Sequence, residues 1–543
     1  MMKMKILSIG IAFCLVLSAC SPAAQNSSTT APTQTQNPET TVPPYVQKDM
    51  VTKEVSADAT KIQLSDDGIQ VNGAAISSDE TAAVYAANDI VFYPEGKDFT
   101  YGEGTQEDAH SQEEADQHTV VHITKPGQYI LSGKLSAGQI AVDLGKDAEE
   151  DPNAVVTLVL NNVDITCTVA PGVIFYNVYE CGEADEETAQ MAVDTSAAGA
   201  NVIIADGTTN TVRGSYVAKI YKSVELNEDK TEVVDSKKLH KYDAAFYSKK
   251  TMNIYGEKES TGVLNIYAEN EGLDSELHLS LYSGNIHIES GNDGINTNED
   301  NVSVTHILGG TLDIVVNGAT GEGDGIDSNG WLVIDGGIIT SSACGFSGDA
   351  GIDADKGVYI RGGQVIAGGN MLDHVQGEQT HLVLTFSQRQ KGGNTYTLKN
   401  EAGSTVLTCA PANDFQYLIL SSPVIEEGNY TLWQGQTQLT AAKAGGQMGG
   451  GMFGPGMGKP EGERPEMPQW PEGEIPTHPQ GQRPERPEGE KPELPEGEVP
   501  SFPQGGQRPG GGMFGPGMGE NGTGETTKIL TVTKGANQFR ITA

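Results

Sequence analysis

A five-residue pattern recurs four times in the middle of the chain, and it restricts the fold more than any other feature. In each copy a glycine is followed by an aliphatic residue and then by a side chain that carries oxygen. The copies are Asn270-Glu271-Gly272-Leu273-Asp274, Asn292-Asp293-Gly294-Ile295-Asn296, Gly323-Asp324-Gly325-Ile326-Asp327 and Asp349-Ala350-Gly351-Ile352-Asp353. Their glycines are 22, 31 and 26 residues apart, and a fainter copy at 243–247 lies 27 residues before the first. Periods of this length indicate stacked units, each forming one turn of a solenoid.

Each period holds three short runs in which aliphatic and polar residues alternate, as they do in strands. One period reads Ile326-Asp327-Ser328, Leu332-Val333-Ile334 and Ile338-Ile339-Thr340, with a Gly336-Gly337 break before the last run. Double glycines of this kind mark corners. No stretch of these periods has apolar residues at the spacing of a helix. We therefore expect an all-β protein, a parallel β-helix with three strands per coil. A β-sandwich of short strands is the alternative, and the equivalence of the loops argues against it.

The first twenty residues have the features of a secretory signal. Two lysines precede an apolar run from Ile6 to Leu17, which ends at Leu17-Ser18-Ala19-Cys20. The run is too short to span a membrane permanently, whereas the small residues before Cys20 suit cleavage and lipid attachment at its sulfur. We expect 1–20 to be a lipoprotein signal peptide and 21–55, rich in Ser, Thr and Pro, to be a flexible linker. The mature chain would be a monomer, lipid-anchored on the extracellular face of the cell membrane.

The chain is strongly acidic, with a net charge of −39 over 543 residues. This balance excludes nucleic acid as a natural partner, because phosphate neutralisation needs Lys and Arg. It also disfavours direct binding to anionic polymers, except through metal ions.

The four cysteines outside the signal are widely scattered. They are Cys167, Cys181, Cys344 and Cys409. Their spacing fits neither a disulfide framework nor a zinc site. Cys167 and Cys181 either pair across neighbouring strands or remain buried free thiols.

The segment 444–526 is low in complexity, with one Gly-rich decapeptide present twice and Pro-Glu-Gly-Glu four times. Such a stretch cannot bury enough apolar surface to offset its ordering entropy, so we expect a disordered insertion. Apolar runs return in 527–543 and are typical of strands. We expect them to close a β-rich C-terminal cap formed by 381–443, because the last coil of a solenoid at 56–380 would otherwise present an open edge.

Stacking would place equivalent residues of the copies in columns roughly 4.8 Å apart. The aliphatic residues should face the interior, and the oxygen-bearing residues after them should face outward. Clustered carboxylate, amide and carbonyl oxygens suit a hard divalent ion, and the lack of His or Cys favours calcium over zinc. Alternatively, these side chains only stabilise tight turns. The expected calcium ligands are Glu271, Asp274, Asp293, Asn296, Asp324, Asp327, Asp349 and Asp353.

The second strand of each coil supplies another outward column. It runs through Tyr255, Tyr282, Leu308, Asp335 and Arg361. Aromatic rings in a shallow row stack on the apolar faces of sugars, while polar neighbours bond hydroxyls. Ordinary cross-strand packing on an exposed sheet explains such a row equally well. The expected carbohydrate contacts are Tyr255, Tyr282, Trp331, Tyr359 and Arg361.

The segment 118–165 adds a second motif block. It contains Gly-Gln-Tyr-Ile-Leu-Ser-Gly-Lys-Leu at 127–135 and Val-Val-Thr-Leu-Val-Leu-Asn-Asn-Val-Asp-Ile at 155–165. Together with Gly-Asp-Gly-Ile-Asp-Ser at 323–328, this resembles a family of bacterial secreted carbohydrate-binding domain-containing proteins, over roughly 58–440 and the last strands. The resemblance implies a right-handed parallel β-helix related in shape to pectate lyases. It also implies calcium sites and affinity for plant cell-wall polysaccharide, notably polygalacturonate.

Three functions are consistent with these features. The first is a non-catalytic, surface-anchored lipoprotein that binds an acidic plant cell-wall polysaccharide with calcium. The second is a calcium-dependent polysaccharide lyase, in which a basic side chain removes the proton next to a uronate carboxylate, with Arg361 as the first candidate and Lys356 as the second. Against it, Arg361 lies beside Asp335 in its column, which would keep it charged and paired. The third is a structural adhesin stiffened by calcium.

Overall fold

In a computed structural model, residues 41, 43–47, 49–182, 184–443 and 526–542 are described. The expected signal peptide, the lipid site Cys20 and nearly all of the low-complexity segment lie outside the described residues. Strands dominate the described part. Its helices are one α-helix of four residues, α1 (Gln112–Ala115), and one 3₁₀ helix of five residues, Lys146–Glu150. Neither has the length or the apolar character needed to cross a membrane.

The first of three ladders of parallel strands, here called the acidic ladder, pairs its strands in sequence order. A single bridge between Ile295 and Ile326 continues its register to the third copy of the repeat. At the other end, β4 (Val84–Ala87) pairs antiparallel with the first strand. The parallel strands are β5 (Thr119–Ile123), β7 (Gly138–Val142), β9 (Val173–Phe175), β14 (Ala244–Ser248), β17 (Glu271–Ser275) and β20 (Ile295–Thr297).

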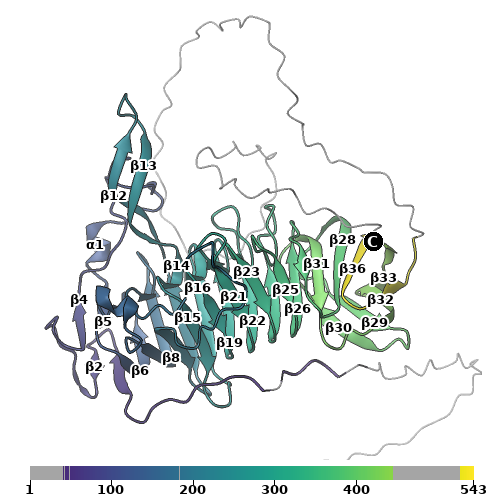
Figure 1. Ribbon diagram of the computed structural model, residues 1–543, viewed down its shortest axis with the longest axis horizontal. Coiled ribbons are helices and arrows are strands. Elements are labelled where there is room, and N and C mark those ends of the chain that lie inside the picture. The colour runs from purple at the N-terminus through teal and green to yellow at the C-terminus, as the bar shows by residue number, and fades with distance from the viewer. Residues whose placement is uncertain (1–40, 42, 48, 183, 444–525, 543) are drawn as a thin grey trace, which may run out of the picture. The chain divides into compact units, whose positions relative to one another are not determined.

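The second ladder, here called the aromatic ladder, is formed by the next strand of each period (Figure 1). It begins with the first half of the long strand β8 (Val156–Cys167). Its other strands are β10 (Ala200–Ile204), β15 (Met252–Gly256), β18 (Leu279–Leu281), β21 (Val304–Ile307), β23 (Trp331–Ile334), β25 (Val358–Ile360) and β27 (Val375–Gln376).

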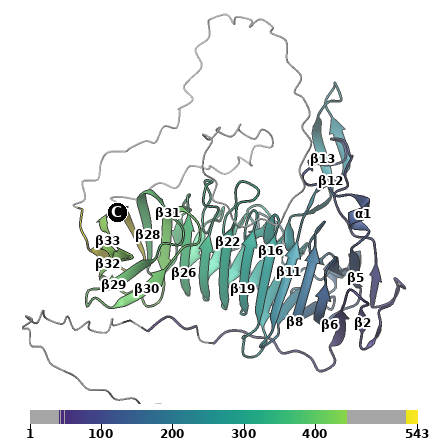
Figure 2. The ribbon, with the colours of Figure 1, turned by 180° about the vertical axis from the view of Figure 1, so that it is seen from behind.

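The third ladder, here called the outer ladder, is formed by the last strand of each period. Its strands can be followed in Figure 2, which shows the molecule from behind. The second half of β8 belongs to it, and β6 (Gly127–Leu135) pairs with both halves of β8. The short strands β1 (Thr60–Leu64), β2 (Gln70–Val71) and β3 (Ala74–Ala75) extend the sheet beyond β6. The remaining strands are β11 (Thr209–Gly214), β16 (Val263–Ala268), β19 (Asn285–Ser290), β22 (Thr311–Val316), β24 (Ile338–Ser342) and β26 (Gln364–Gly369).

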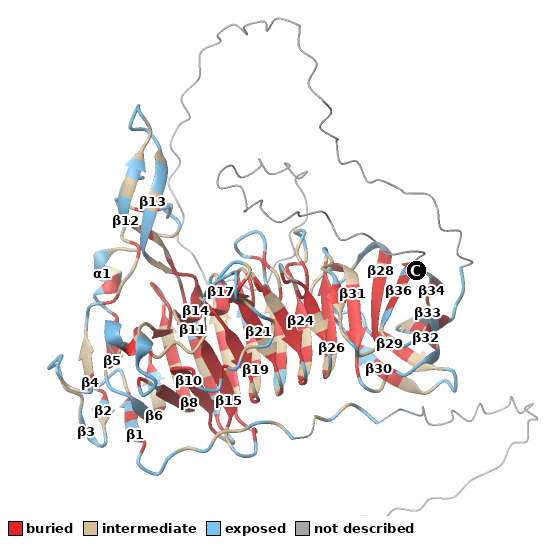
Figure 3. Cartoon of the chain, viewed as in Figure 1, coloured by how far each residue is buried: buried red, intermediate tan, exposed pale blue. Residues whose placement is uncertain are grey.

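The register of the acidic ladder accounts for the apolar core. Leu273 lies opposite Ile295, and Ile295 lies opposite Ile326. These residues and Ile352 are fully buried in one apolar cluster, to which the inner side chains of all three ladders contribute (Figure 3). The aliphatic residues of the repeat therefore face the interior, as the strand period predicts.

Space, rather than backbone conformation, explains the glycines of the repeat. None of the four has a positive φ. A Cβ atom on Gly294 would lie 2.3 Å from Cγ2 of Ile314 and 2.5 Å from the carbonyl oxygen of Gly325. On Gly272 and Gly325 it would likewise meet the carbonyl of the next copy, at 2.5 Å and 2.3 Å. Neighbouring backbones approach so closely at this corner that no side chain fits between them.

Beyond β26 the pairing becomes mostly antiparallel and forms a cap. One cap sheet joins β26 to β31, β28, β36 and β34, and another contains the remaining strands. Residues on both sides of the low-complexity segment therefore take part in the same sheets. The cap strands are β28 (His381–Gln390), β29 (Tyr396–Asn400), β30 (Thr405–Cys409), β31 (Phe415–Ser421), β32 (Gly428–Gln434), β33 (Thr437–Gln438), β34 (Thr440–Lys443), β35 (Leu530–Val532) and β36 (Ala536–Thr542).

Two segments depart from the repeat. A charged region forms an antiparallel hairpin of β12 (Val217–Leu226) and β13 (Val233–Tyr242), much of which is exposed (Figure 3). Gln47, Val51 and Lys53, which were expected to belong to a flexible linker, instead bond to the ladders. The amide nitrogen of Lys53 donates to the carbonyl of Gly256 (3.1 Å), and Gln47 Nε2 donates to that of Leu308 (2.7 Å). This part of the chain is therefore not a free tether.

The four described cysteines are free thiols. Cys167, Cys344 and Cys409 are buried, and Cys181 is half-buried. Cys167 and Cys181 do not pair, so the free-thiol alternative holds for both.

Candidate functional site

Two groups of three carboxylates lie on the outer side of the acidic ladder. In each group, one oxygen atom from every residue lies within 4.8 Å of the others. The sequence pattern predicted all of these residues as cation ligands except Asp243, which belongs to the fainter copy at 243–247. The first group is Asp243, Glu271 and Asp274, and the second is Asp324, Asp327 and Asp353.

The first group contains buried oxygen atoms that accept no hydrogen bond. Asn296 Nδ2 donates to Oε1 of Glu271 (3.2 Å), and Asn298 Nδ2 donates to Oδ1 of Asp274 (2.8 Å). The other oxygens of the same side chains, Glu271 Oε2, Asp274 Oδ2 and Asn296 Oδ1, are buried without a partner among the described residues. Buried polar atoms are nearly always satisfied, so three unsatisfied acceptors on adjacent strands indicate room for a cation. An all-oxygen donor set fits calcium.

The electrostatics of the first group lead to the same conclusion. Burial raises the pKa of both Glu271 and Asp274 well above the usual range, and repulsion from neighbouring carboxylates raises it further. The outward-facing carboxylates expected from the sequence are therefore covered here rather than solvated: Asp274 is fully buried. One cation is nearby, since Lys241 Nζ lies 2.6 Å from Oδ2 of Asp243. A single ammonium cannot balance three carboxylates, and a second positive charge would relieve the remaining repulsion.

The second group is partly exposed and more loosely enclosed. Oδ1 of Asp324 accepts the amide N–H of Ala350 (2.6 Å). Burial raises the pKa of Asp353 to about 7, and Asp373 and Asp327 add to the shift. Burial also raises the pKa of Asp324, and repulsion from Asp293 raises it further. The main charged neighbours of this group are therefore themselves acidic. The group is more accessible to an external ligand than the first group.

Asp373 is a further acidic residue beside the second group, since its charge helps to raise the pKa of Asp353. Its Oδ2 atom is buried and accepts no hydrogen bond among the described residues, and Leu372 before it packs against the core. Sequence reasoning missed this residue because the Leu372-Asp373 pair keeps the aliphatic-acidic order of the repeat but lacks the glycine.

Asp293 and Asp349 have a different role from the residues of the two groups. Oδ1 of Asp293 accepts the N–H of Asp324 (2.7 Å), and Oδ2 of Asp349 accepts the N–H of Gly323 (2.9 Å). Each carboxylate thus bonds the backbone of a neighbouring copy, as the turn-stabilising alternative predicts. Neither residue belongs to the two groups.

The aromatic residues do not form an open platform. Tyr255 is only 5% exposed and stacks on Tyr282, with ring centroids 4.6 Å apart. Lys53 Nζ lies 4.7 Å from the centroid of the Tyr255 ring and helps to cover it. Tyr255 is therefore covered rather than open to a sugar, as the cross-strand packing alternative predicts. Trp331 and Tyr359, on β23 and β25, are half-buried, and Lys356 Nζ lies 5.0 Å from the Trp331 ring.

Arg361 forms an ion pair with Asp335. Its Nε and Nη2 atoms donate to the two carboxylate oxygens, each over 2.7 Å. His306 Nε2 also lies 2.7 Å from Oδ2 of Asp335. Hydrogen bonds from His306 and Arg361 outweigh burial and lower the pKa of Asp335 to about 2. A guanidinium held by an ionised carboxylate stays protonated and is poorly placed to act as a base.

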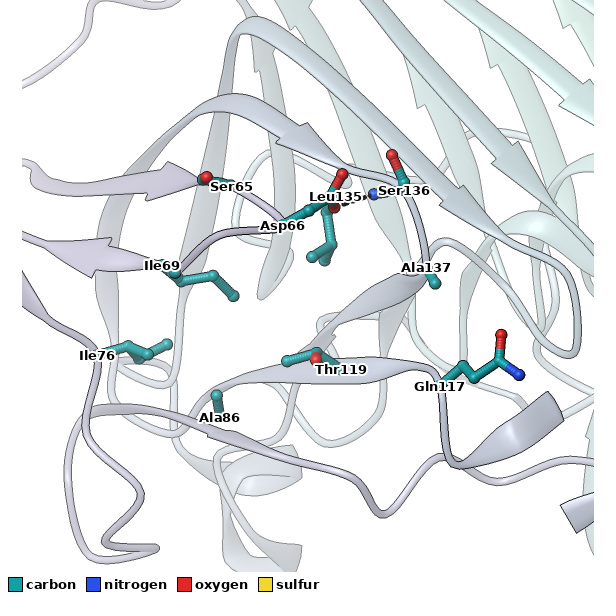
Figure 4. A pocket seen from close by; sticks show the side chains of 11 residues that line it. Ser65, Asp66, Ile69, Ile76, Ala86, Gln117, Thr119, Leu135, Ser136 and Ala137 are labelled. Carbon is teal, nitrogen blue, oxygen red and sulfur yellow. Dashed lines mark hydrogen bonds between the residues drawn. The ribbon is translucent and has the colours of Figure 1, made fainter. Parts of the chain in front are cut away.

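A shallow pocket near the N-terminal strands carries no comparable chemistry (Figure 4). Its one titratable side chain, Asp66, accepts the N–H of Ser136 (2.7 Å), and this bond lowers its pKa. The lining residues are Ser65, Asp66, Gly68, Ile69, Ile76, Ala86, Gln117, Thr119, Leu135, Ser136 and Ala137.

Comparisons with known proteins identify a family. A family model described as "Carbohydrate-binding domain-containing protein" matches residues 117–405. Among solved structures, the chain is similar to a polysaccharide lyase-like protein from C. thermocellum, solved as a gadolinium derivative, with 20% sequence identity. That alignment covers 59% of this chain and 90% of the other, but its TM-score of 0.31 is too low to carry an argument. No curated protein matches the chain.

Proposed function

Because this chain belongs to the family of carbohydrate-binding domain-containing proteins, we propose that it binds polysaccharide at the cell surface without cleaving it. In this proposal binding depends on calcium, and the target is an acidic plant cell-wall polymer such as polygalacturonate. The mature protein is a lipoprotein held to the membrane through Cys20.

The observation that carries the proposal is the set of unsatisfied oxygens on the acidic ladder. Glu271, Asp274 and Asn296 each keep one buried oxygen without a hydrogen bond. These residues, with Asp243, would hold a structural calcium ion. Asp324, Asp327 and Asp353 would hold a more accessible one. Calcium accepts six to eight oxygen ligands, so at a partly exposed site it supplies positive charge and coordination positions that sugar oxygens can use.

Charge explains why an acidic protein would need calcium to bind an acidic polymer. At a net charge of −39 the chain repels a polyuronate, and added salt only screens that repulsion. A divalent ion shared between protein and sugar reverses the sign of the local potential.

The pairing of the candidate bases supports binding without cleavage. Arg361 is held by both oxygens of Asp335, and Lys356 lies over the ring of Trp331. Arg361 directly follows β25 of the aromatic ladder, whereas the two carboxylate groups belong to the acidic ladder.

We also propose that the three ladders wind as one right-handed parallel β-helix. Successive strands of one period, such as β17, β18 and β19, fall in the acidic, aromatic and outer ladders in that order. The next period repeats the order with β20, β21 and β22. The right-handed twist of strands favours right-handed connections between parallel strands.

A pull-down of the mature protein tests the proposed function. Insoluble polygalacturonate should retain the protein in calcium and release it in EDTA, whereas cellulose and xylan should show no calcium response. Equal retention with and without calcium would contradict the proposal. In parallel, the ultraviolet absorbance of the unsaturated lyase product should stay flat. A steady rise that is lost in Arg361→Ala would make the protein a lyase instead.

A further inference from the structure

A second pocket lies at the N-terminal end of the acidic ladder, and none of its lining residues belongs to the two carboxylate groups. It has a volume of about 320 Å³. Strands β5 and β7 form one wall, the residues after β9 form the floor, and the end of the hairpin strand β13 contributes His240 and Tyr242. Lys249, just after β14, completes the lining.

Lys249 is a half-buried cation without an ion-pair partner among the described residues. Burial lowers its pKa. The two acidic residues whose charges raise its pKa are already engaged: Glu276 pairs with Lys238 (3.1 Å), and Glu149 pairs with Lys250 (2.9 Å). In a chain with 73 acidic and 34 basic residues, an unpaired and partly desolvated lysine is an exception. A buried charge is normally paired, so this one calls for an anion from outside the chain.

The remaining polar groups of the pocket suit sugar hydroxyls. His122 Nε2 lies 2.8 Å from Oδ1 of Asp89, and the His122 ring stacks on Tyr85, which fixes its orientation. Oδ1 of Asp143 accepts Nδ2 of Asn177 (2.8 Å). Carboxylate oxygens accept hydrogen bonds from hydroxyl groups. The same two carboxylates disfavour a multiply charged ligand such as a phosphate, because its extra charge would be repelled.

Aromatic surface completes the environment. The rings of Tyr176 and Tyr242 meet edge to face, with centroids 5.6 Å apart. His240 Nδ1 lies 2.5 Å from the hydroxyl of Tyr242. Tyr242 is itself buried, so the half-buried Tyr176 offers the aromatic surface that can contact the apolar C–H face of a sugar ring.

We propose that this pocket binds one uronate ring of the polysaccharide, with Lys249 pairing with its carboxylate and with Asp89 and Asp143 accepting hydrogen bonds from its hydroxyls. The inference rests on the proposed function and refines it, since it adds a subsite that needs no metal.

The strand register relates the pocket to the first carboxylate group. His122, Ala141, Ile174, Tyr247 and Asp274 lie opposite one another on successive strands. Four strand spacings, roughly 19 Å, therefore separate His122 from Asp274 along the same face, whereas Tyr242 of the pocket is next in sequence to Asp243 of the first carboxylate group.

Calorimetry with trigalacturonate in EDTA tests the subsite separately from calcium. The wild type should bind the trimer, and Lys249→Gln should weaken binding about tenfold or more, as expected for the loss of a charge-assisted contact. Lys249→Arg should retain most of the affinity. The matched control is Lys237→Gln, which removes the same charge from an exposed position on the hairpin and should bind like the wild type. Galactotriose, which lacks carboxylates, should bind much more weakly than trigalacturonate.

Thermal unfolding without ligand checks that Lys249→Gln is folded. Its midpoint should equal or exceed that of the wild type, because the substitution removes an unpaired buried charge. Equal trimer affinity for Lys249→Gln and wild type, or no trimer binding by the wild type in EDTA, overturns the subsite. Calcium-dependent retention on polygalacturonate would then still support the proposed function. Conversely, trimer binding that depends on Lys249, without calcium-dependent retention, would support the subsite and contradict the calcium mechanism.

Discussion

The side-chain amide of Asn296 donates a hydrogen bond to Oε1 of Glu271 on the neighbouring strand over 3.2 Å, while Oε2 of Glu271 and Oδ1 of Asn296 are buried without a hydrogen-bond partner among the described residues. The amide thus satisfies one carboxylate oxygen and leaves two acceptors unsatisfied on adjacent strands. Unsatisfied buried acceptors are costly, and a bound cation removes that cost.

The double variant Asp327→Ala/Asp353→Ala should bind calcium more weakly and keep the circular dichroism spectrum of a β protein. Both side chains are partly exposed, so their removal creates no apolar cavity, and in EDTA it relieves repulsion within the group. Calorimetric titration with calcium measures the loss. The control is Asp313→Ala, which removes an acidic residue that bonds His287 on the outer ladder. An unfolded double variant would show that these carboxylates are part of the core packing.

The buried residue His278 should make stability depend on pH. Its Nδ1 atom accepts the N–H of Val304 (3.1 Å), and burial lowers its pKa from 6.5 to about 4. The depressed pKa means that the folded state binds fewer protons than the unfolded state. The stabilisation is complete above about pH 6.5 and is lost as the pH falls toward 4, by roughly 3 kcal/mol. Urea unfolding of the wild type and His278→Asn across this range measures the difference, and parallel pH curves would contradict it.

Gly294→Ala should destabilise the fold by roughly 1–3 kcal/mol, because its Cβ would collide with a backbone carbonyl that cannot move independently. Gly348→Ala is the matched control, since a Cβ there meets nothing within 4 Å. Denaturant unfolding compares the two variants. If both lose the same stability, the glycines of the repeat are not required by space.

Deletion of 446–524 should leave a folded protein that binds its ligand. The flanking strands are already joined, because Ala441 and Thr527 exchange two backbone hydrogen bonds of 2.7 and 2.8 Å. The deletion therefore closes a short connection between neighbouring strands and removes no described contact. Circular dichroism and the polygalacturonate pull-down check the variant. Loss of folding would assign the segment to the cap.

The repeated pattern predicted those features that follow from strand periodicity. The inward positions of Leu273 and Ile295 and the clustering of Asp327 with Asp353 both follow from a period of two on stacked strands. The covering of Tyr255 could not be predicted, because the residues that cover it, such as Lys53, lie about two hundred positions earlier in the chain.

The other differences between the roles expected from the sequence and those observed in the structure also depend on tertiary contacts. The role of Asp349 is set by the backbone N–H nearest to its carboxylate, which belongs to Gly323 in another copy. The pocket around Lys249 combines residues from five separate parts of the chain, and none of them belongs to the four copies of the repeat. Asp373 alone had a detectable signal, the aliphatic-acidic pair without its glycine.

Thermal unfolding of the mature protein in EDTA and in excess calcium tests the central claim most directly. A cation held by the carboxylates of the acidic ladder binds the folded chain alone. At a hundredfold excess over its dissociation constant it should add about 2.7 kcal/mol of stability. We predict a higher midpoint in calcium and a smaller difference in Asp327→Ala/Asp353→Ala. Identical midpoints for the wild type with and without calcium would contradict the account, and the carboxylates would then only stabilise turns.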